Sequence, residues 1–311
     1  MEFKPSENTK LYGMSHFFDE IAKLYSRKKM PTKILLSGKK GVGKSTLAYH
    51  IINHILSADE EFKYDSINFI INENNKSYKL LQNNSHPNFY LIDLLNDKKN
   101  IDVAQIREMI AYTNKSTFNN MARFILIDNI ENLNKSSINA LLKIIEEPNE
   151  NIFFILINNS EKNILPTLRS RCLTFKINLT FNESMNISNL ILGDNIFDLI
   201  NHDLINYYNT PGEIINLINF SIDKKIDLKN YTLINLLKLL IDNGYYKKNK
   251  NVKILLINFI ELFFLKEYKL NTRNSFLIFY HNFINKINNT EKFNLDEESL
   301  FLEFKSKLLN G

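Results

Sequence analysis

One short run of residues constrains the fold of this chain more than any other. Residues 38–45 read Gly-Lys-Lys-Gly-Val-Gly-Lys-Ser and satisfy the pattern G-x-x-x-x-G-K-[ST] at each defined position. The run holds three of the eight glycines in a chain of 311 residues, so it does not reflect a glycine-rich composition. Glycines let the backbone curl until successive N–H groups point at one anion. The elements on either side must therefore hold a tight anion-binding turn.

The flanking residues predict a strand before this run and a helix after it. Residues 33–37 read Lys-Ile-Leu-Leu-Ser, a short buried strand, and apolar residues recur with helical period from Leu47 to Leu56. Strand, loop and helix N-terminus together form an anion site. The sequence thus predicts a nucleotide-binding fold in which Lys44 reaches the β- and γ-phosphates and the Ser45 hydroxyl ligates Mg²⁺.

A second strand that ends in an acid completes such a site. Residues 124–128 read Phe-Ile-Leu-Ile-Asp, which places Asp128 at the carboxyl end of a predicted strand, where it can position Mg²⁺. Asn129 follows, where hydrolytic members of this fold usually carry a glutamate that polarises the attacking water. An amide cannot accept a proton, and Glu131 lies out of register for that role. We therefore expect ATP and Mg²⁺ to bind while hydrolysis is weak or absent. The residues expected to bind the cofactor are Gly38, Gly41, Val42, Gly43, Lys44, Ser45, Thr46 and Asp128, with Ser45 and Asp128 as the Mg²⁺ ligands.

The first part of the chain alternates strand-like and helix-like segments, which predicts an α/β fold with a parallel sheet. A helix is predicted over 136–147, with Ser136 as its cap and Pro148 just after it. Residues 59–88 are polar and irregular, which predicts a surface insertion. The predicted strands are 33–37, 89–94, 123–128, 152–157 and 173–177.

Beyond Leu179 the pattern becomes helical. Thr210-Pro211-Gly212 interrupts this part and predicts a turn or the start of a helix. Long helices are expected at about 228–243, 252–269, 274–288 and 296–309, apolar enough to form a bundle or to offer one face to neighbouring subunits.

Composition excludes several classes of protein. No apolar stretch approaches the ~18 residues that cross a bilayer, and no basic-then-apolar leader begins the chain, so we expect a cytoplasmic protein without a membrane partner. The single cysteine, Cys172, excludes an intrachain disulfide framework and a cysteine-rich zinc site. The formal net charge is +5, and a basic run extends from Lys23 to Lys44. Such a run either faces phosphates or is a solvated surface.

Two further motifs resemble those of clamp-loader subunits of the AAA+ family. Residues 139–148 read Asn-Ala-Leu-Leu-Lys-Ile-Ile-Glu-Glu-Pro and resemble the N-A-L-L-K-x-x-E-E-P segment, and residues 165–172 read Leu-Pro-Thr-Leu-Arg-Ser-Arg-Cys and resemble L-x-T-x-x-S-R-C. The run Ile101-x-Val103-x-x-Ile106-Arg107 is similar to a helix start in the same group. With the two nucleotide motifs, the resemblance covers about residues 10–215. It is closest to the delta-prime family of bacterial DNA polymerase III subunits.

The resemblance implies an assembly role. It implies an AAA+ nucleotide-binding domain at 1–178, a helical lid at 179–222 and a helical collar at 223–311. It also implies a hetero-oligomer with gamma/tau and delta subunits that loads the sliding clamp onto primed DNA as part of the nucleotidyltransferase holoenzyme. In such a ring Arg171 is the expected catalytic residue, an arginine finger that reaches the ATP site of the neighbouring subunit.

The sequence departs from the family in two places and leaves one position open. Residues 59–90 lack the four cysteines of the family's zinc module, so no zinc is expected. Glu213 follows Pro211-Gly212 where hydrolysing subunits usually carry an arginine, and it would repel a γ-phosphate that it faced. At the sensor position, after the strand at 152–157, Asn158 or Asn159 can contact phosphate.

Alternative interpretations remain open. The chain can instead be a hydrolysing gamma/tau-type subunit or another AAA+ replication or repair ATPase, which the intact Lys44 and Ser45 favour. A stand-alone DNA-repair ATPase would need a DNA-binding module that the sequence lacks. His50 and His54 have the i, i+4 spacing of metal ligands, but with no acid or cysteine beside them they are expected to be flanking or partly buried histidines. Cys172 is expected to be a small buried residue rather than a nucleophile.

Overall fold

The computed structural model describes residues 4–95, 98–115, 121–146, 151–159, 164–247, 249–270, 274–293 and 295–309. The chain divides into two compact units. The first comprises Met1–Leu190 with Thr210–Gly212, and the second comprises Ile191–Asn209 with Glu213–Gly311. The three-part division at residues 178 and 222 stays a prediction.

The described part of the first unit is built on a five-stranded parallel sheet, as the sequence predicts, with strand order β2-β3-β4-β1-β5. All five predicted strands form, and their ends differ from the prediction by no more than two residues. The largest difference is at β2, which ends two residues before its predicted end. Asp93 therefore lies just beyond the strand instead of inside it. The strands are β1 Lys33–Ser37, β2 Phe89–Ile92, β3 Arg123–Ile127, β4 Ile152–Asn158 and β5 Leu173–Lys176.

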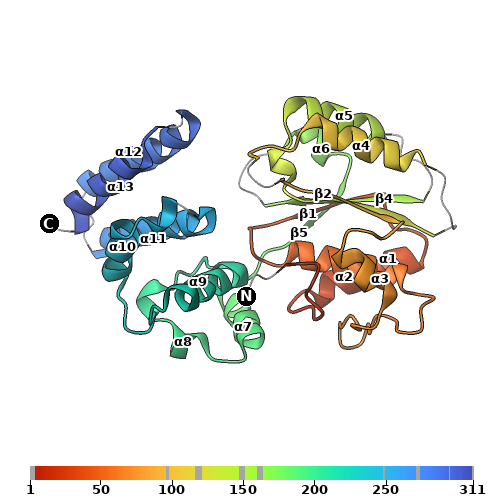
Figure 1. Ribbon diagram of the computed structural model, residues 1–311, viewed down its shortest axis with the longest axis horizontal. Helices are drawn as coiled ribbons and strands as arrows, with labels where there is room; N and C mark the ends of the chain where they lie inside the picture. Colours follow the sequence, from red (N-terminus) through yellow and green to blue (C-terminus); the bar gives the residue numbers. More distant parts are fainter. Residues whose placement is uncertain are drawn as a thin grey trace. The chain divides into compact units, whose positions relative to one another are not determined.

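Helices cover both faces of this sheet (Figure 1). On one face lie α1 (Ser15–Ser26), α2 (Lys44–Leu56) and α3 (Lys76–Gln82), and on the other lie α4 (Val103–Thr113), α5 (Lys135–Glu146) and α6 (Pro166–Arg169). Strand β1 alternates between the two resulting cores. Ile34 and Leu36 pack with the first group, and Leu35 packs with the second. A strand buried on both faces reads as an uninterrupted apolar run, which is how the sequence reads here.

The predicted surface insertion at 59–88 is wrong. This segment contains α3, and four of its apolar side chains are buried in the core beside α2, namely Tyr64, Ile71, Tyr78 and Leu81. Its polar residues are used internally. The Asn75 side chain caps α3 by accepting from the Tyr78 N–H, and the Asn53 amide donates to Asn75. A polar composition therefore marks buried hydrogen bonds here, and not an exposed loop.

The predicted cap of the helix at 136–147 also needs correction. Helix α5 begins at Lys135, and it is Asn134, not Ser136, whose side chain accepts from the backbone N–H of Ser137 at 2.8 Å. Asparagine and serine are about equally favourable as N-caps. When both occur within one turn, the sequence alone does not identify which of them caps the helix. The predicted end at Glu147 and Pro148 lies outside the described residues.

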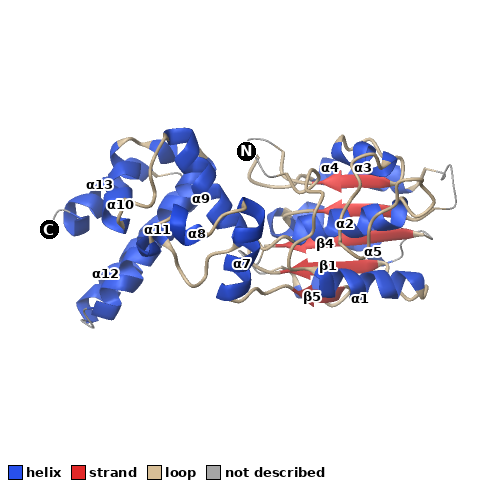
Figure 2. Cartoon of the chain, turned by 90° about the horizontal axis from the view of Figure 1, so that it is seen from below, coloured by secondary structure: helices blue, strands red, loops and turns tan. Residues whose placement is uncertain are grey.

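The second unit consists of helices among its described residues, and the long helices predicted there are confirmed (Figure 2). Helix α7 (Phe181–Leu192) bridges the boundary in sequence, and α9 begins at Pro211, as predicted. In the core of the second unit, the rings of Phe263, Phe264, Phe283 and Phe304 contact one another. The remaining elements are α8 Ile196–Leu199, α9 Pro211–Lys224, α10 Leu233–Asp242, α11 Lys250–Leu270, α12 Asn274–Phe293, α13 Glu297–Phe304, the π-helical turn Lys305–Leu309, and the short 3-10 turns Ile130–Asn132 (first unit), His202–Leu204 and Tyr245–Lys247. Among the helices described in either unit, none is long and apolar enough to span a bilayer.

Candidate nucleotide site

The phosphate loop lies between β1 and α2, where the sequence predicts it. Its first glycine is sterically required, because a Cβ on Gly38 would lie 2.1 Å from the carbonyl oxygen of Ile177. Gly43 has φ +101°, a left-handed conformation that side chains rarely adopt, and α2 begins at the next residue. The loop therefore ends at the N-terminus of a helix of 13 residues, where backbone N–H groups favour an anion. Val42, also among the predicted residues, packs into the core with 5% of its surface exposed.

Lys44 lies inside the loop. Its ammonium group donates to the carbonyl oxygens of Gly38 at 2.9 Å and Lys39 at 2.7 Å, and the residue is only 3% exposed. A buried ammonium is costly unless its hydrogen bonds are satisfied, and here the loop's own carbonyls contribute. Phosphate oxygens would offer the same group a stronger, charged acceptor.

Ser45 and Asp128 meet at the carboxyl edge of the sheet, as predicted. The Ser45 hydroxyl donates to the Asp128 carboxylate at 2.5 Å, across 83 positions of sequence. Burial raises the pKa of Asp128 to about 6, the nearby Asp93 charge adds to that rise, and the bond from Ser45 opposes it. A hydroxyl and a carboxylate are oxygen ligands of the kind that Mg²⁺ takes beside phosphates. The predicted Thr46 accepts from the Asn8 amide at 3.4 Å, so the N-terminal segment lies beside the first turn of α2.

Asn129 is held by Asp93, an acid outside the sequence motifs. Its side-chain amide donates to the Asp93 carboxylate at 2.6 Å, and its backbone N–H donates to Asp128 at 2.7 Å. Asp93 and Asp128 follow the neighbouring strands β2 and β3, so their carboxylates lie at the same edge of the sheet. The signal that would have found Asp93 is the one that found Asp128, an acid directly after a buried parallel strand.

The two candidate sensor amides have partners within the protein. Asn159 donates to the side-chain oxygen of Asn129 at 2.7 Å and to Glu131 at 3.1 Å. Asn158 donates to the Ser37 hydroxyl at 3.3 Å. Glu131 thus supports Asn159, and its position relative to an attacking water stays a prediction. Asp93, Asn129, Asn159 and Glu131 form one continuous hydrogen-bonded chain along the edge of the sheet.

A second segment packs directly on the phosphate loop. The Thr210 hydroxyl donates to the carbonyl oxygen of Lys40 at 2.9 Å, and the backbone N–H of Gly212 donates to the carbonyl oxygen of Gly41 at 3.0 Å. A Cβ on Gly212 would lie 2.7 Å from the Gly41 Cα, so a side chain does not fit there. The sequence marks these residues only as a helix start, because nothing local indicates a contact 170 positions away. The proposed effect of Glu213 on a γ-phosphate stays a prediction.

Arg171 lies in the turn between α6 and β5. Its guanidinium forms an ion pair with Glu146 at 2.8 Å and donates to the carbonyl oxygen of Thr167 at 2.8 Å, and its side chain is 37% exposed. The structure therefore joins the last described residue of the Asn139–Pro148 motif to the S-R-C motif. Cys172 donates to the carbonyl oxygen of Leu168, and burial raises the pKa of its thiol to about 11. A thiol with this pKa stays protonated near neutral pH and is a poor nucleophile.

The two histidines of α2 are packing residues. His50 is fully buried between the Tyr64 hydroxyl at 2.9 Å and the Asn8 carbonyl at 3.1 Å, and burial lowers its pKa to about 4. His54 contacts the rings of Phe18 and Tyr64. Both surroundings confirm buried or partly buried histidines. Over the ranges that the structure describes, no group of three or more His, Cys, Asp or Glu side chains is arranged to hold a metal ion.

The sequence is similar to those of DNA polymerase III subunits. The profile of the family described as "DNA polymerase III, delta subunit" matches residues 13–180. The delta-prime subunit of Buchnera aphidicola subsp. Schizaphis graminum (strain Sg) is 33% identical over 185 residues, 58% of this chain and 54% of that protein. The gamma subunit of the same organism is 32% identical over 244 residues, 74% of this chain and 63% of that protein. The chain thus spans less than two thirds of either relative.

A solved structure of similar architecture is that of a DNA polymerase III gamma subunit-related protein from Thermotoga maritima. Its TM-score is 0.46 at 16% identity, over 94% of this chain and 92% of that one. Because this score is below 0.5, membership in a family rests on the sequence matches.

Proposed function

The chain belongs to the family of DNA polymerase III delta subunits, and we propose that within it the chain acts as a stator of the delta-prime type. In this role it binds ATP with Mg²⁺, hydrolyses it weakly or not at all, and donates Arg171 to the nucleotide site of a neighbouring subunit. Its partners are gamma/tau and delta subunits in a hetero-oligomer that loads the sliding clamp onto primed DNA. Residues 1–178 would form the AAA+ domain, 179–222 the lid and 223–311 the collar.

Binding of ATP with Mg²⁺ is supported by the arrangement of the phosphate loop. The loop's backbone and Lys44 would hold the phosphates, and Ser45 with Asp128 would hold the metal ion. Mg²⁺ bound there would supply positive charge that neutralises the β- and γ-phosphate oxygens. A Cβ on Gly38 would clash with the carbonyl oxygen of Ile177, and Gly43 has a left-handed backbone conformation, so both of these positions in the loop favour glycine.

Weak hydrolysis is supported by Asn129, and this is the observation that carries the proposal. The residue beside Asp128 is an amide, and its amide and carbonyl groups are already bonded to Asp93 and Asn159. It therefore has no proton-accepting group to offer a water molecule. The site retains its binding groups while the usual base is replaced.

A role in trans is supported by the position of Arg171. Its side chain lies at the surface, and its pairing with Glu146 is an exposed ion pair of small net energy. A planar guanidinium at this position can exchange that carboxylate for phosphate oxygens of another subunit without leaving an unpaired buried charge.

The proposal is tested by measuring steady-state ATP hydrolysis of the full chain alone and mixed with gamma/tau and delta subunits, clamp and primed DNA. We expect little or no turnover by the chain alone, strong turnover in the mixture, and a loss on the order of 10³-fold for Arg171→Ala in the mixture. Arg27→Ala, which removes an exposed arginine after α1, is the matched control and should have no effect. Unchanged turnover of the Arg171→Ala mixture would refute the role in trans.

A hydrolysing ATPase, either gamma/tau-type or another AAA+ replication or repair ATPase, is the second candidate function. One observation favours it. Asp93 places a second carboxylate beside Asp128, bonded to the amide that replaces the glutamate. If the isolated chain hydrolyses ATP, Lys44→Ala should abolish the turnover and Asp93→Asn should reduce it, and that result would favour this candidate over the stator.

A further inference from the structure

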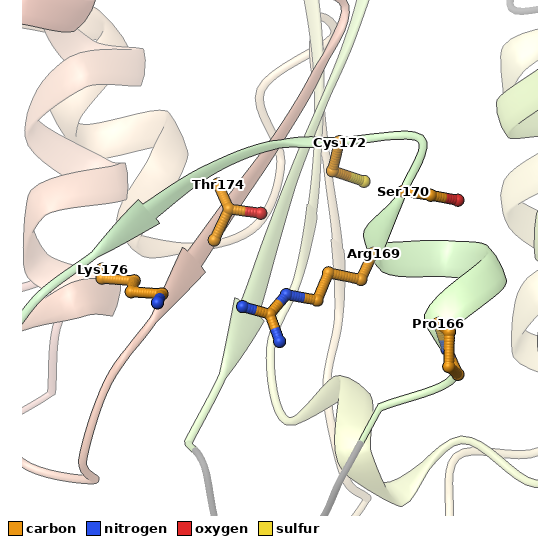
Figure 3. Close-up of a pocket in the computed structure, with 6 residues that line it drawn as sticks. All are labelled: Pro166, Arg169, Ser170, Cys172, Thr174 and Lys176. Carbon is orange, nitrogen blue, oxygen red and sulfur yellow. The ribbon is translucent and has the colours of Figure 1, made fainter.

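An open hollow lies between α6 and the edge strand β5, on the face of the sheet that α4 and α5 cover (Figure 3). It is separate from the phosphate loop. Figure 3 shows Arg169 extending from α6 toward β5, with Thr174 and Lys176 pointing into the same space. The residues that line it are Pro166, Arg169, Ser170, Cys172, Thr174 and Lys176.

The hollow collects positive charge. Arg169 and Lys176 are both exposed, and neither forms an ion pair with any residue in the described ranges. Arg171, two positions on, differs because Glu146 neutralises it. Lys33 is also close enough to lower the pKa of Cys172, against the larger effect of burial. Cations that share a space without an acid attract an anion.

A purely structural explanation accounts for only part of this arrangement. A lysine on an edge strand discourages pairing with another sheet, and Lys176 on β5 fits that role. Arg169 is on a helix, so edge protection does not explain why its guanidinium lies over the same strand. A planar guanidinium, an ammonium and the Thr174 hydroxyl together provide several donors for one tetrahedral oxyanion.

We infer that this hollow is a phosphate-binding pocket in which Arg169 and Lys176 hold the phosphates of a nucleotide bound on the neighbouring subunit. The assignment of the phosphate to a nucleotide of the neighbouring subunit rests on the proposed function, because that function places Arg171 at the nucleotide site of the same subunit.

The pocket itself is tested on the full chain with inorganic pyrophosphate as the probe, in a Lys44→Ala background that weakens competing binding at the phosphate loop. The arginine side-chain N–H signals are followed by NMR during titration. We expect saturable binding that shifts the Arg169 signal and weakens about tenfold in Arg169→Ala/Lys176→Ala, the loss expected for about 1.4 kcal/mol of charge-assisted bonding.

The matched control is Arg27→Ala/Lys29→Ala, which removes the same charge near the end of α1, a helix on the other face of the sheet. It should bind like its parent. Equal weakening in both double variants would mean that only net charge matters and would overturn the pocket, as would the absence of binding. Thermal unfolding of each variant checks that the fold is intact.

The source of the phosphate is tested in the assembled mixture, with Lys44 intact. If the neighbour's nucleotide is the ligand, Arg169→Ala/Lys176→Ala should raise the KM for ATP more than it lowers kcat. Unchanged kinetics after a positive titration would overturn the neighbouring nucleotide as the source and leave a site for free phosphate. If no complex assembles, or Arg171→Ala has no effect, the proposed function fails while the titration still decides the pocket.

Discussion

Replacing Asp128 by asparagine should stabilise this protein while weakening its ligand site. Burial raises the pKa of Asp128 from its ordinary value of 3.8 to about 6. The folded chain therefore binds this proton more tightly than the unfolded chain does, so stability falls as the pH rises from 3.8 to about 6. The cost is complete above the folded pKa and absent below the unfolded one.

The size of the effect follows from the same two values. A difference of about two pKa units corresponds to about 3 kcal/mol above pH 7. Because Asp128 retains part of its solvent-accessible surface in the folded chain, we expect about 1–2 kcal/mol in practice. An asparagine can still accept from the Asn129 N–H and pair with the Ser45 hydroxyl, so it keeps the two local hydrogen bonds.

The assay is guanidinium unfolding of the full chain and of Asp128→Asn at a series of pH values between 4 and 8. The variant should be more stable near pH 7.5, and the difference should shrink toward zero near pH 4. Asp65→Asn is the control of opposite sign, because hydrogen bonds, chiefly from the Asn68 side chain, lower the pKa of that exposed carboxyl. Calorimetric titration with ATP and Mg²⁺ should show weaker binding by Asp128→Asn. A variant no more stable than its parent at pH 7.5, or equally more stable at pH 4, would refute the reasoning.

Two other predictions concern the fold around the site. Asn134→Ala should lower the free energy of unfolding by about 1 kcal/mol, because it removes the acceptor for the Ser137 N–H at the start of α5, while Ser136→Ala should change it little. Denaturant titration of the two variants distinguishes the caps, and equal losses would contradict the assignment. Gly212→Ala should cost about 1–3 kcal/mol and weaken ATP binding in calorimetry, because its Cβ would press on the Gly41 backbone. Unchanged affinity would mean that this contact does not support the loop.

Local patterns predicted the parts of this fold that local physics determines. The strand at 33–37 and the loop after it follow from an apolar run and a motif with a steric requirement at Gly38. The prediction for residues 59–88 is wrong because buried hydrogen bonds, such as that between Asn53 and Asn75, need polar residues, just as exposed loops do. The packing of Gly212 on Gly41 depends on two segments far apart in the chain, which no periodicity reports.

Within the candidate site, the sequence predicts the groups that would bind the ligand better than it predicts the residues that hydrogen-bond to the site residues and position them. Lys44, Ser45 and Asp128 belong to motifs whose residue spacing predicts phosphate and Mg²⁺ binding, and the structure brings these residues together. Asp93 is absent from the predicted site because the predicted strand extends to residue 94 and places this acid inside the strand, whereas β2 ends at Ile92. The pairing of Arg171 with Glu146 joins two motifs whose mutual position only the fold determines.

The groups that would bind the ligand and the residue at the position of the usual base differ in what their burial costs the free energy of folding. The carboxylate of Asp128 opposes folding near neutral pH, because burial disfavours its charged form, whereas the buried ammonium of Lys44 donates hydrogen bonds to carbonyl oxygens of the loop. A divalent cation bound beside Asp128 would offset the cost of that carboxylate. Asn129, by contrast, is neutral and has its hydrogen bonds satisfied by Asp93 and Asn159, so it needs no ligand to be stable. The fold thus carries an energetic cost at the group that would bind the metal ion and none at Asn129, which agrees with the proposal of a subunit that holds nucleotide rather than one that hydrolyses it.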